Sequence, residues 1–157
     1  MKKLQIDEAN ARKLYPTASK EWKTTLEDTF GKEFFSQKIT NRMKTWEDIC
    51  DELDIDPINS LPFKKAKDKT EKYLNACFKI SKISEVLNEG EKLDFNNSST
   101  YKYYPYFQRK GSVWLVDSCS YYDFFTDLCF GSYYKNYELA LYAGNQFLDI
   151  YSDYLPE

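Results

Sequence analysis

The spacing of apolar side chains changes once along this 157-residue sequence, near residue 100, and this change most constrains the fold. Before it, apolar residues recur every three or four positions, which places them on one face of an α-helix. After a polar loop at residues 96–100, residues 101–108 and 113–122 alternate with a period of two, which is typical of β-strands joined by a short turn. The sequence therefore predicts an α+β fold with its sheet in the tyrosine-rich C-terminal part.

Residues 1–56 are predicted to form a helical N-terminal subregion. Trp22, Leu26 and Phe30 are spaced four residues apart, and Gly31 follows them as a helix end. Thr45 suits the N-cap of a further helix that ends near residue 53, with the acidic Asp48 at its third position. Residues 57–65 contain two prolines and are predicted to form a loop.

Residues 66–157 are predicted to hold a long helix, the sheet and a C-terminal helix. The long helix spans residues 66–88 and ends before Gly90, and a third strand is predicted near residues 126–131. The last helix, residues 136–154, contains Gly144, which costs about 1 kcal/mol relative to alanine, so we expect a close helix-on-sheet contact there. We thus expect a single α+β domain over residues 1–157, with a helical N-terminal half followed by a three-stranded antiparallel β-meander packed by a C-terminal helix.

The two aromatic strands suggest one core face and one exposed face. If Lys110 and Gly111 form the turn, Phe107 lies opposite Trp114. These two residues share with Tyr101 and Tyr103 a face that is expected to pack on the C-terminal helix. The other face, which also holds Leu115 and Cys119, is amphipathic and is expected to be exposed. Because tyrosines often anchor protein interfaces, we predict a binding site on that face. Its residues are Lys102, Tyr104, Tyr106 and Asp117.

The composition excludes many kinds of catalytic and metal site. The sequence has no histidine, which removes Ser-His-Asp triads and histidine zinc sites. The four cysteines form no C-x-x-C pair, and Cys77 and Cys129, which lie among apolar residues, are interpreted as small core residues in a reducing compartment. The aspartates at positions 51, 54 and 56 do not fit the EF-hand spacing. A histidine-free enzyme would depend on carboxylates such as Asp117, Asp123 and Asp127, whose spacing is not specific. We therefore predict a protein that is not an enzyme, with no catalytic residue, no metal and no cofactor.

The charge and hydropathy of the chain limit the kinds of partner that we expect it to bind. No segment approaches 18 consecutive apolar residues, so we expect no membrane-spanning helix and a cytoplasmic location. The net charge is -3, which does not favour nucleic-acid binding. The less favoured alternative is nevertheless a nucleic-acid-associated protein, in which the aromatic sheet stacks bases and the Lys-rich helix at residues 64–82 contacts phosphates.

Several segments resemble a group of short proteins of bacteriophages and prophages of gut bacteria that have no assigned activity. The resemblance extends over about residues 8–155 and rests on residues 29–35 (TFGKEFF), 73–77 (YLNAC), 87–90 (LNEG), 102–105 (KYYP), 128–130 (LCF) and 138–147 (ELALYAGNQF). It differs at Glu91, where members of the group often have an aromatic residue. The resemblance implies a phage accessory protein that binds a host or phage protein, in the bacterial cytoplasm or as part of the virion.

Overall fold

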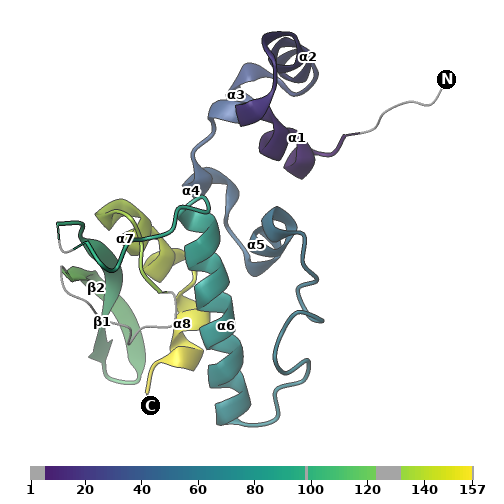
Figure 1. Ribbon diagram of the computed structural model, residues 1–157. Coiled ribbons are helices and arrows are strands. Elements are labelled where there is room, and N and C mark those ends of the chain that lie inside the picture. The colour runs from purple at the N-terminus through teal and green to yellow at the C-terminus, as the bar shows by residue number, and fades with distance from the viewer. Residues whose placement is uncertain (1–5, 98, 123–131, 157) are drawn as a thin grey trace. The chain divides into compact units, whose positions relative to one another are not determined.

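The computed structural model describes residues 6–97, 99–122 and 132–156, and the chain changes from helix to strand near residue 100, as the apolar spacing predicts (Figure 1). The longest helix, α6 (Lys69–Leu87), precedes a hairpin of β1 (Lys102–Lys110) and β2 (Val113–Tyr122). Helices α7 (Tyr137–Gln146) and α8 (Leu148–Tyr154) follow. The predicted α+β class is confirmed.

The chain divides into two compact units, Met1–Arg42 and Met43–Glu157. The sequence analysis instead places the boundary between the helical N-terminal subregion and the rest of the chain at the loop of residues 57–65. The division lies earlier because α5 (Trp46–Leu53) packs on α6, with the rings of Trp46 and Phe78 edge to face at 6.3 Å between centroids. The Trp46 indole Nε1 also donates a hydrogen bond of 2.9 Å to the carbonyl oxygen of Pro57, which ties the start of the loop to α5 within the second unit.

The first unit consists of short helices around partly exposed aromatic rings. Its elements are α1 (Glu8–Leu14), the 3-10 turn η1 (Tyr15–Thr17), α2 (Lys20–Phe30), α3 (Lys32–Ser36) and α4 (Ile39–Arg42). Gly31 ends α2 with a φ of 86°, a conformation that glycine adopts without strain. The rings of Tyr15 and Phe35 stack at 4.0 Å, and those of Phe30 and Phe34 stack at 5.2 Å. These ring contacts hold a unit that is too small for a large core.

The second unit begins with helices whose ends follow from local sequence. Thr45 caps α5 as predicted: its hydroxyl accepts a hydrogen bond from the Asp48 backbone N–H, and the Asp48 carboxylate accepts one from the Thr45 N–H. The predicted stop of α6 is also confirmed, because Gly90 has a φ of 73° and its N–H donates to the Glu85 carbonyl oxygen. Helix α6 buries Ile80, Ile83 and Leu87 among others. Helices α5 and α6 thus form one side of the core.

The C-terminal helix is broken, whereas the sequence predicts one helix over residues 136–154. Phe147 leaves the helical conformation, with φ −114° and ψ 31°, and separates α7 from α8. This break lets Phe147, Ile150 and Tyr151 all lie buried. Helix α7 packs on both strands of the hairpin, and α8 packs on α6 (Figure 1).

The sheet has two strands in the part of the chain that the structure describes, so the predicted three-stranded meander is wrong there. The third strand was expected at residues 126–131, which lie outside the described residues. On the outer edge of β1, Tyr134 forms an isolated bridge with Tyr103 instead of a further strand.

The pairing of the two strands differs from the predicted register. The strands close at the pair Lys110 and Val113, so the two turn residues are Gly111 and Ser112, and Gly111 has the φ of +64° that this turn requires. A β-bulge at Asp117 then shifts the pairing, because this residue has no partner between the pairs Phe107–Val116 and Tyr106–Ser118. The bulge brings Cys119, expected on the exposed face, toward α7, where its thiol contacts the Tyr137 carbonyl oxygen at 3.6 Å.

No helix in the described part of the chain is long and apolar enough to cross a membrane.

Candidate functional site: an exposed tyrosine cluster on the hairpin

Three tyrosines gather at the open end of the hairpin, and we call Tyr101, Tyr103 and Tyr121 the tyrosine cluster. Tyr103 and Tyr121 are direct cross-strand partners, and Tyr101 lies just before β1. The ring centroids of Tyr101 and Tyr121 are 4.5 Å apart, those of Tyr103 and Tyr121 are 6.0 Å apart, and those of Tyr101 and Tyr103 are 6.3 Å apart. These distances and tilted orientations are those at which aromatic rings attract one another.

The tyrosine cluster is open to solvent on a fixed support. Tyr101 is 46% exposed and Tyr121 is 54% exposed, while Tyr103 is half-buried. The backbone of Tyr103 exchanges hydrogen bonds of 3.0 and 2.7 Å with Tyr134, which is fully buried. The Tyr134 hydroxyl in turn lies 3.0 Å from that of Tyr151 in the core. The backbone that carries the exposed rings is therefore fixed to the core by these hydrogen bonds.

The four residues predicted to bind a partner do not form one exposed surface. Lys102 is 1% exposed, and its ammonium donates a 2.6 Å hydrogen bond to the Asn97 carbonyl oxygen. Tyr104 is half-buried, with its ring edge to face with Tyr133 at 6.0 Å. Tyr106 is 51% exposed, and Asp117 is exposed at the bulge. Lys102 is therefore buried and Tyr104 is only partly accessible, and a binding role for Tyr106 and Asp117 stays a prediction.

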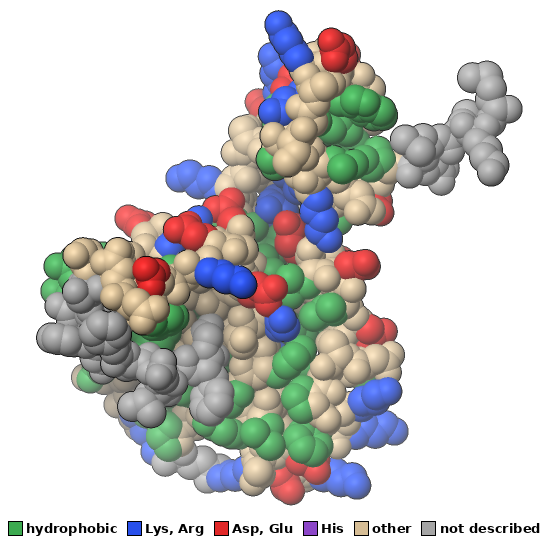
Figure 2. Space-filling view, in the orientation of Figure 1, with side chains coloured by type: hydrophobic (Ala, Val, Ile, Leu, Met, Phe, Trp, Pro, Cys, Tyr) green, Lys and Arg blue, Asp and Glu red, His purple; other side chains and the backbone are tan. Residues whose placement is uncertain are grey.

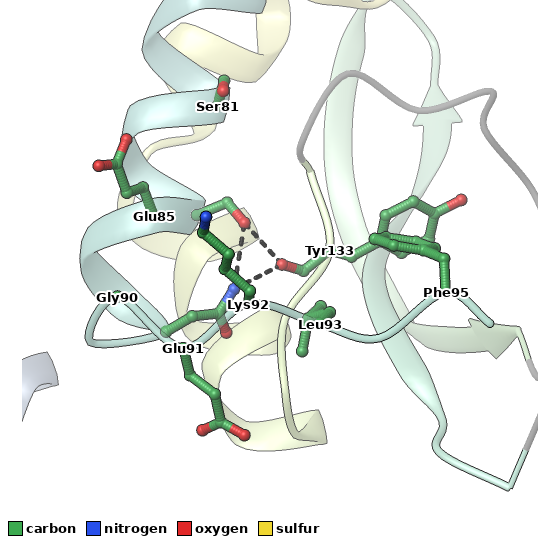
Figure 3. Close-up of a pocket in the computed structure, with 10 residues that line it drawn as sticks. Ser81, Glu85, Gly90, Glu91, Lys92, Leu93, Phe95 and Tyr133 are labelled. Atoms are coloured by element: carbon green, nitrogen blue, oxygen red, sulfur yellow. Dashed lines mark hydrogen bonds between the residues drawn. The ribbon is translucent and has the colours of Figure 1, made fainter. Parts of the chain in front are cut away.

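A pocket of about 290 Å³ lies at the C-terminal end of α6 (Figure 3). The loop that follows the helix and Tyr133 close its other sides, with Leu93 and Phe95 as apolar lining. In its floor, the Ser84 hydroxyl and the Asn88 amide both donate to the Tyr133 carbonyl oxygen, at 2.6 and 2.8 Å. The polar floor is thus occupied by hydrogen bonds that hold Tyr133 to α6.

The two carboxylates of this pocket are not arranged as an acid–base pair. Figure 3 shows Glu85 and Glu91 pointing away from each other. Glu85 pairs with Lys82 at 2.7 Å, and Glu91 lies 3.4 Å from the ammonium of Lys135. General acid–base catalysis needs both groups within reach of one substrate, so this geometry supports no hydrolytic role for the pocket.

In the acidic segment after α5, backbone N–H groups hydrogen-bond to an aspartate side chain. The Asp56 carboxylate accepts hydrogen bonds from the N–H groups of Asn59 and Ile58, at 2.6 and 2.9 Å, and these bonds lower the pKa of Asp56. Within the described residues, no group of three or more His, Cys, Asp or Glu side chains is placed to hold a metal ion.

Comparison of the chain with protein families, with curated proteins and with solved structures gives no match. The geometry of the chain itself is therefore the basis for a function.

Sequence reasoning missed the tyrosine cluster because it assigned Tyr101 and Tyr103 to the core face. The two-residue alternation of Tyr101 and Tyr103 was the available signal. The pairing of Tyr103 with Tyr121 depends on the turn and on the bulge, which the alternation does not specify.

Proposed function

We propose that this protein is a non-enzymatic accessory protein of a phage or prophage, and that it acts by binding another protein through the tyrosine cluster. The observation that carries the proposal is the contact among three partly exposed tyrosine rings on a supported strand pair. Tyrosine is enriched among the residues that contribute most to protein interfaces.

The energetics of the tyrosine cluster favour a protein partner. Covering roughly 200 Å² of ring surface contributes on the order of 5 kcal/mol before the costs of association are subtracted. The rings of Tyr101 and Tyr121 already touch, so less side-chain freedom is lost when a partner covers them. Each ring also keeps a hydroxyl that can hydrogen-bond at the rim of an interface.

The charges near the tyrosine cluster give less support to a nucleic-acid partner. A single strand needs basic groups beside the stacking rings. Lys102 adjoins the cluster in sequence, but its ammonium is buried and bonded to the Asn97 carbonyl oxygen. Figure 2 shows acidic and basic side chains interspersed on the face that it presents. These features favour a protein over a polyanion as the partner.

The test uses the tagged 157-residue chain to capture proteins from bacterial lysate, with and without nuclease treatment. Wild type, Tyr101→Ala/Tyr121→Ala and Tyr106→Ala are compared by quantitative mass spectrometry, with circular dichroism to confirm that each variant is folded. We expect one protein whose affinity for the double variant is at least about tenfold weaker, and a smaller loss for Tyr106→Ala, which tests the binding face predicted from the sequence.

Equal capture by all three chains would show that the tyrosine cluster is not the interface. Recovery of nucleic acid alone, lost on nuclease treatment, would replace the protein partner with a nucleic acid.

A further inference from the structure

This chain repeatedly places a cation over an aromatic ring, but it places none over the tyrosine cluster. Six rings among the described residues have an arginine or lysine of the chain between 3.5 and 5.9 Å from their centroids. In the shortest of these contacts, the Arg12 guanidinium lies over the Phe34 ring. No arginine or lysine that the structure describes lies over Tyr101, Tyr103 or Tyr121. The negative faces of these three rings are therefore available to a cation from outside the chain.

The spacing of the three rings suits a single cation. Their centroids are 4.5, 6.0 and 6.3 Å apart, so one cation above them can lie within about 6 Å of each, the range of cation–π attraction. The ring planes are inclined to one another by 56° to 70°, so the rings form no flat stacking platform. Differently oriented rings around one point are the arrangement of the aromatic cages that recognise cations.

The hydroxyls of the tyrosine cluster are available as hydrogen-bond acceptors. Tyr142, by contrast, donates its hydroxyl to the Met43 carbonyl oxygen at 2.6 Å. Within the described residues, the hydroxyls of the tyrosine cluster form no such bond. A guanidinium carries five N–H donors in one plane, so it can lie over one ring and donate to a neighbouring hydroxyl.

The charge around the tyrosine cluster is complementary to a basic group. Residues 83–100, which lead into the cluster, contain four acidic residues and one basic residue, a net charge of −3. The Asp94 carboxylate accepts a 2.9 Å hydrogen bond from the Asn96 backbone N–H and forms no ion pair with a described residue. The ammonium of Lys102 is buried against the Asn97 carbonyl oxygen. This charge attracts a basic segment of a partner and opposes an acidic one.

We propose that the tyrosine cluster binds an arginine side chain of the partner protein, with the guanidinium over the rings and its N–H groups donating to their hydroxyls. This inference rests on the proposed function and names the group that the tyrosine cluster recognises. Arginine is favoured over lysine because a guanidinium is planar and weakly hydrated and stacks on aromatic faces, whereas an ammonium is compact and strongly hydrated. The contact of Arg12 with Phe34 is the same kind of pairing within the chain.

The first experiment measures the binding of a small probe to the 157-residue chain by NMR. The probe is N-acetyl-arginine amide, and its control is N-acetyl-citrulline amide, which has nearly the same shape and no charge. We expect the arginine probe to shift the signals of Tyr101, Tyr103 and Tyr121 in a saturable way. The citrulline probe should bind at least about fivefold more weakly.

Substitutions at Tyr121 separate the ring face from apolar surface. Tyr121→Phe keeps the ring and should bind the probe and the captured protein within about threefold of wild type. Tyr121→Leu keeps a large apolar side chain without a ring, and should weaken both at least about fivefold. The control is Tyr137→Leu, the same change at a 44% exposed position of α7 outside the tyrosine cluster, which should leave binding unchanged. Circular dichroism confirms that each variant is folded.

The outcomes separate this inference from the proposed function. No binding of the arginine probe, equal binding of the two probes, or equal binding of the arginine probe to Tyr121→Leu and wild type would overturn the arginine site. If Tyr101→Ala/Tyr121→Ala still loses the captured protein in that case, the proposed function stands and the partner covers the rings by apolar contact alone. Binding of the arginine probe without capture of any protein would instead support the arginine site and contradict the proposed function.

Discussion

A Cβ atom added to Gly144 would lie 2.7 Å from the Cβ of Pro105, and 3.1 Å from a methyl carbon of Val116. The middle of α7 thus approaches both strands of the hairpin more closely than any residue with a side chain permits. This is the close helix-on-sheet contact that the position of the glycine predicts. It fixes the hairpin, and with it the support of the tyrosine cluster.

Gly144→Ala should lower the free energy of unfolding by up to about 2 kcal/mol. The added methyl group overlaps Pro105, and overpacking of this kind costs about 1–3 kcal/mol, against a gain of about 1 kcal/mol in helix propensity. Urea denaturation measures the change. Asn145→Ala, at the next and exposed position of α7, is the control and should change stability by less than about 0.5 kcal/mol. An increase in stability for Gly144→Ala would contradict the close contact.

Asn75→Ala should release the loop that precedes α6. The buried Asn75 amide donates to the Phe63 carbonyl oxygen at 2.8 Å and accepts from the Phe63 N–H at 3.0 Å. Loss of both bonds should cost about 1–3 kcal/mol. Hydrogen exchange of the Phe63 amide should become faster in the variant. Unchanged exchange at Phe63 would show that the loop is held by other contacts.

Stability should fall at alkaline pH because of two buried phenols. Burial raises the pKa of Tyr134 well above its usual 10.0, and it raises that of Tyr151 as well. A raised pKa means that both phenols stay neutral when folded, so their contribution is present below about pH 10 and is lost as the pH rises above it. Denaturant unfolding between about pH 9 and pH 11 measures this loss.

The control for the alkaline loss is the double variant Tyr134→Phe/Tyr151→Phe, which cannot ionise at either position. It should lose less stability over the same pH range than wild type. A residual loss is expected from Cys50 and Cys119, since burial raises the pKa of each thiol to about 11. An identical pH dependence in wild type and the double variant would contradict the role of the phenols.

We expect Lys102 to contribute to the stability of the fold and not to the binding of a partner. Lys102→Ala removes a buried chain that lies over the Phe95 ring and should cost about 2–3 kcal/mol. Lys102→Met keeps most of the volume and should cost less than about 1.5 kcal/mol. Thermal unfolding measures both changes. If Lys102→Met folds but binds the partner more weakly than wild type, Lys102 belongs to the binding surface and the prediction is wrong.

Helix ends were largely predictable, because their determinants lie within a few residues of each other. Thr45 and Asp48 satisfy each other's backbone groups within one turn, and Gly90 ends α6 by its own conformation. The start of α6 carried a similar signal that was missed. Asp68 caps the helix and Glu71 accepts from the Lys67 N–H, so the helix begins after Asp68 and not at residue 66.

The sequence by itself determined the α+β class, the two strands and the need for a small residue at Gly144, because each depends on local spacing and conformation. The tertiary structure decided which hairpin residues are exposed. The two-residue alternation of the strands allows more than one register, and the turn at Gly111 and the bulge at Asp117 select one of them. Packing against Asn97 and Phe95, outside the hairpin, then buries Lys102. Such contacts depend on the free energy of the whole core, which no short window of sequence contains.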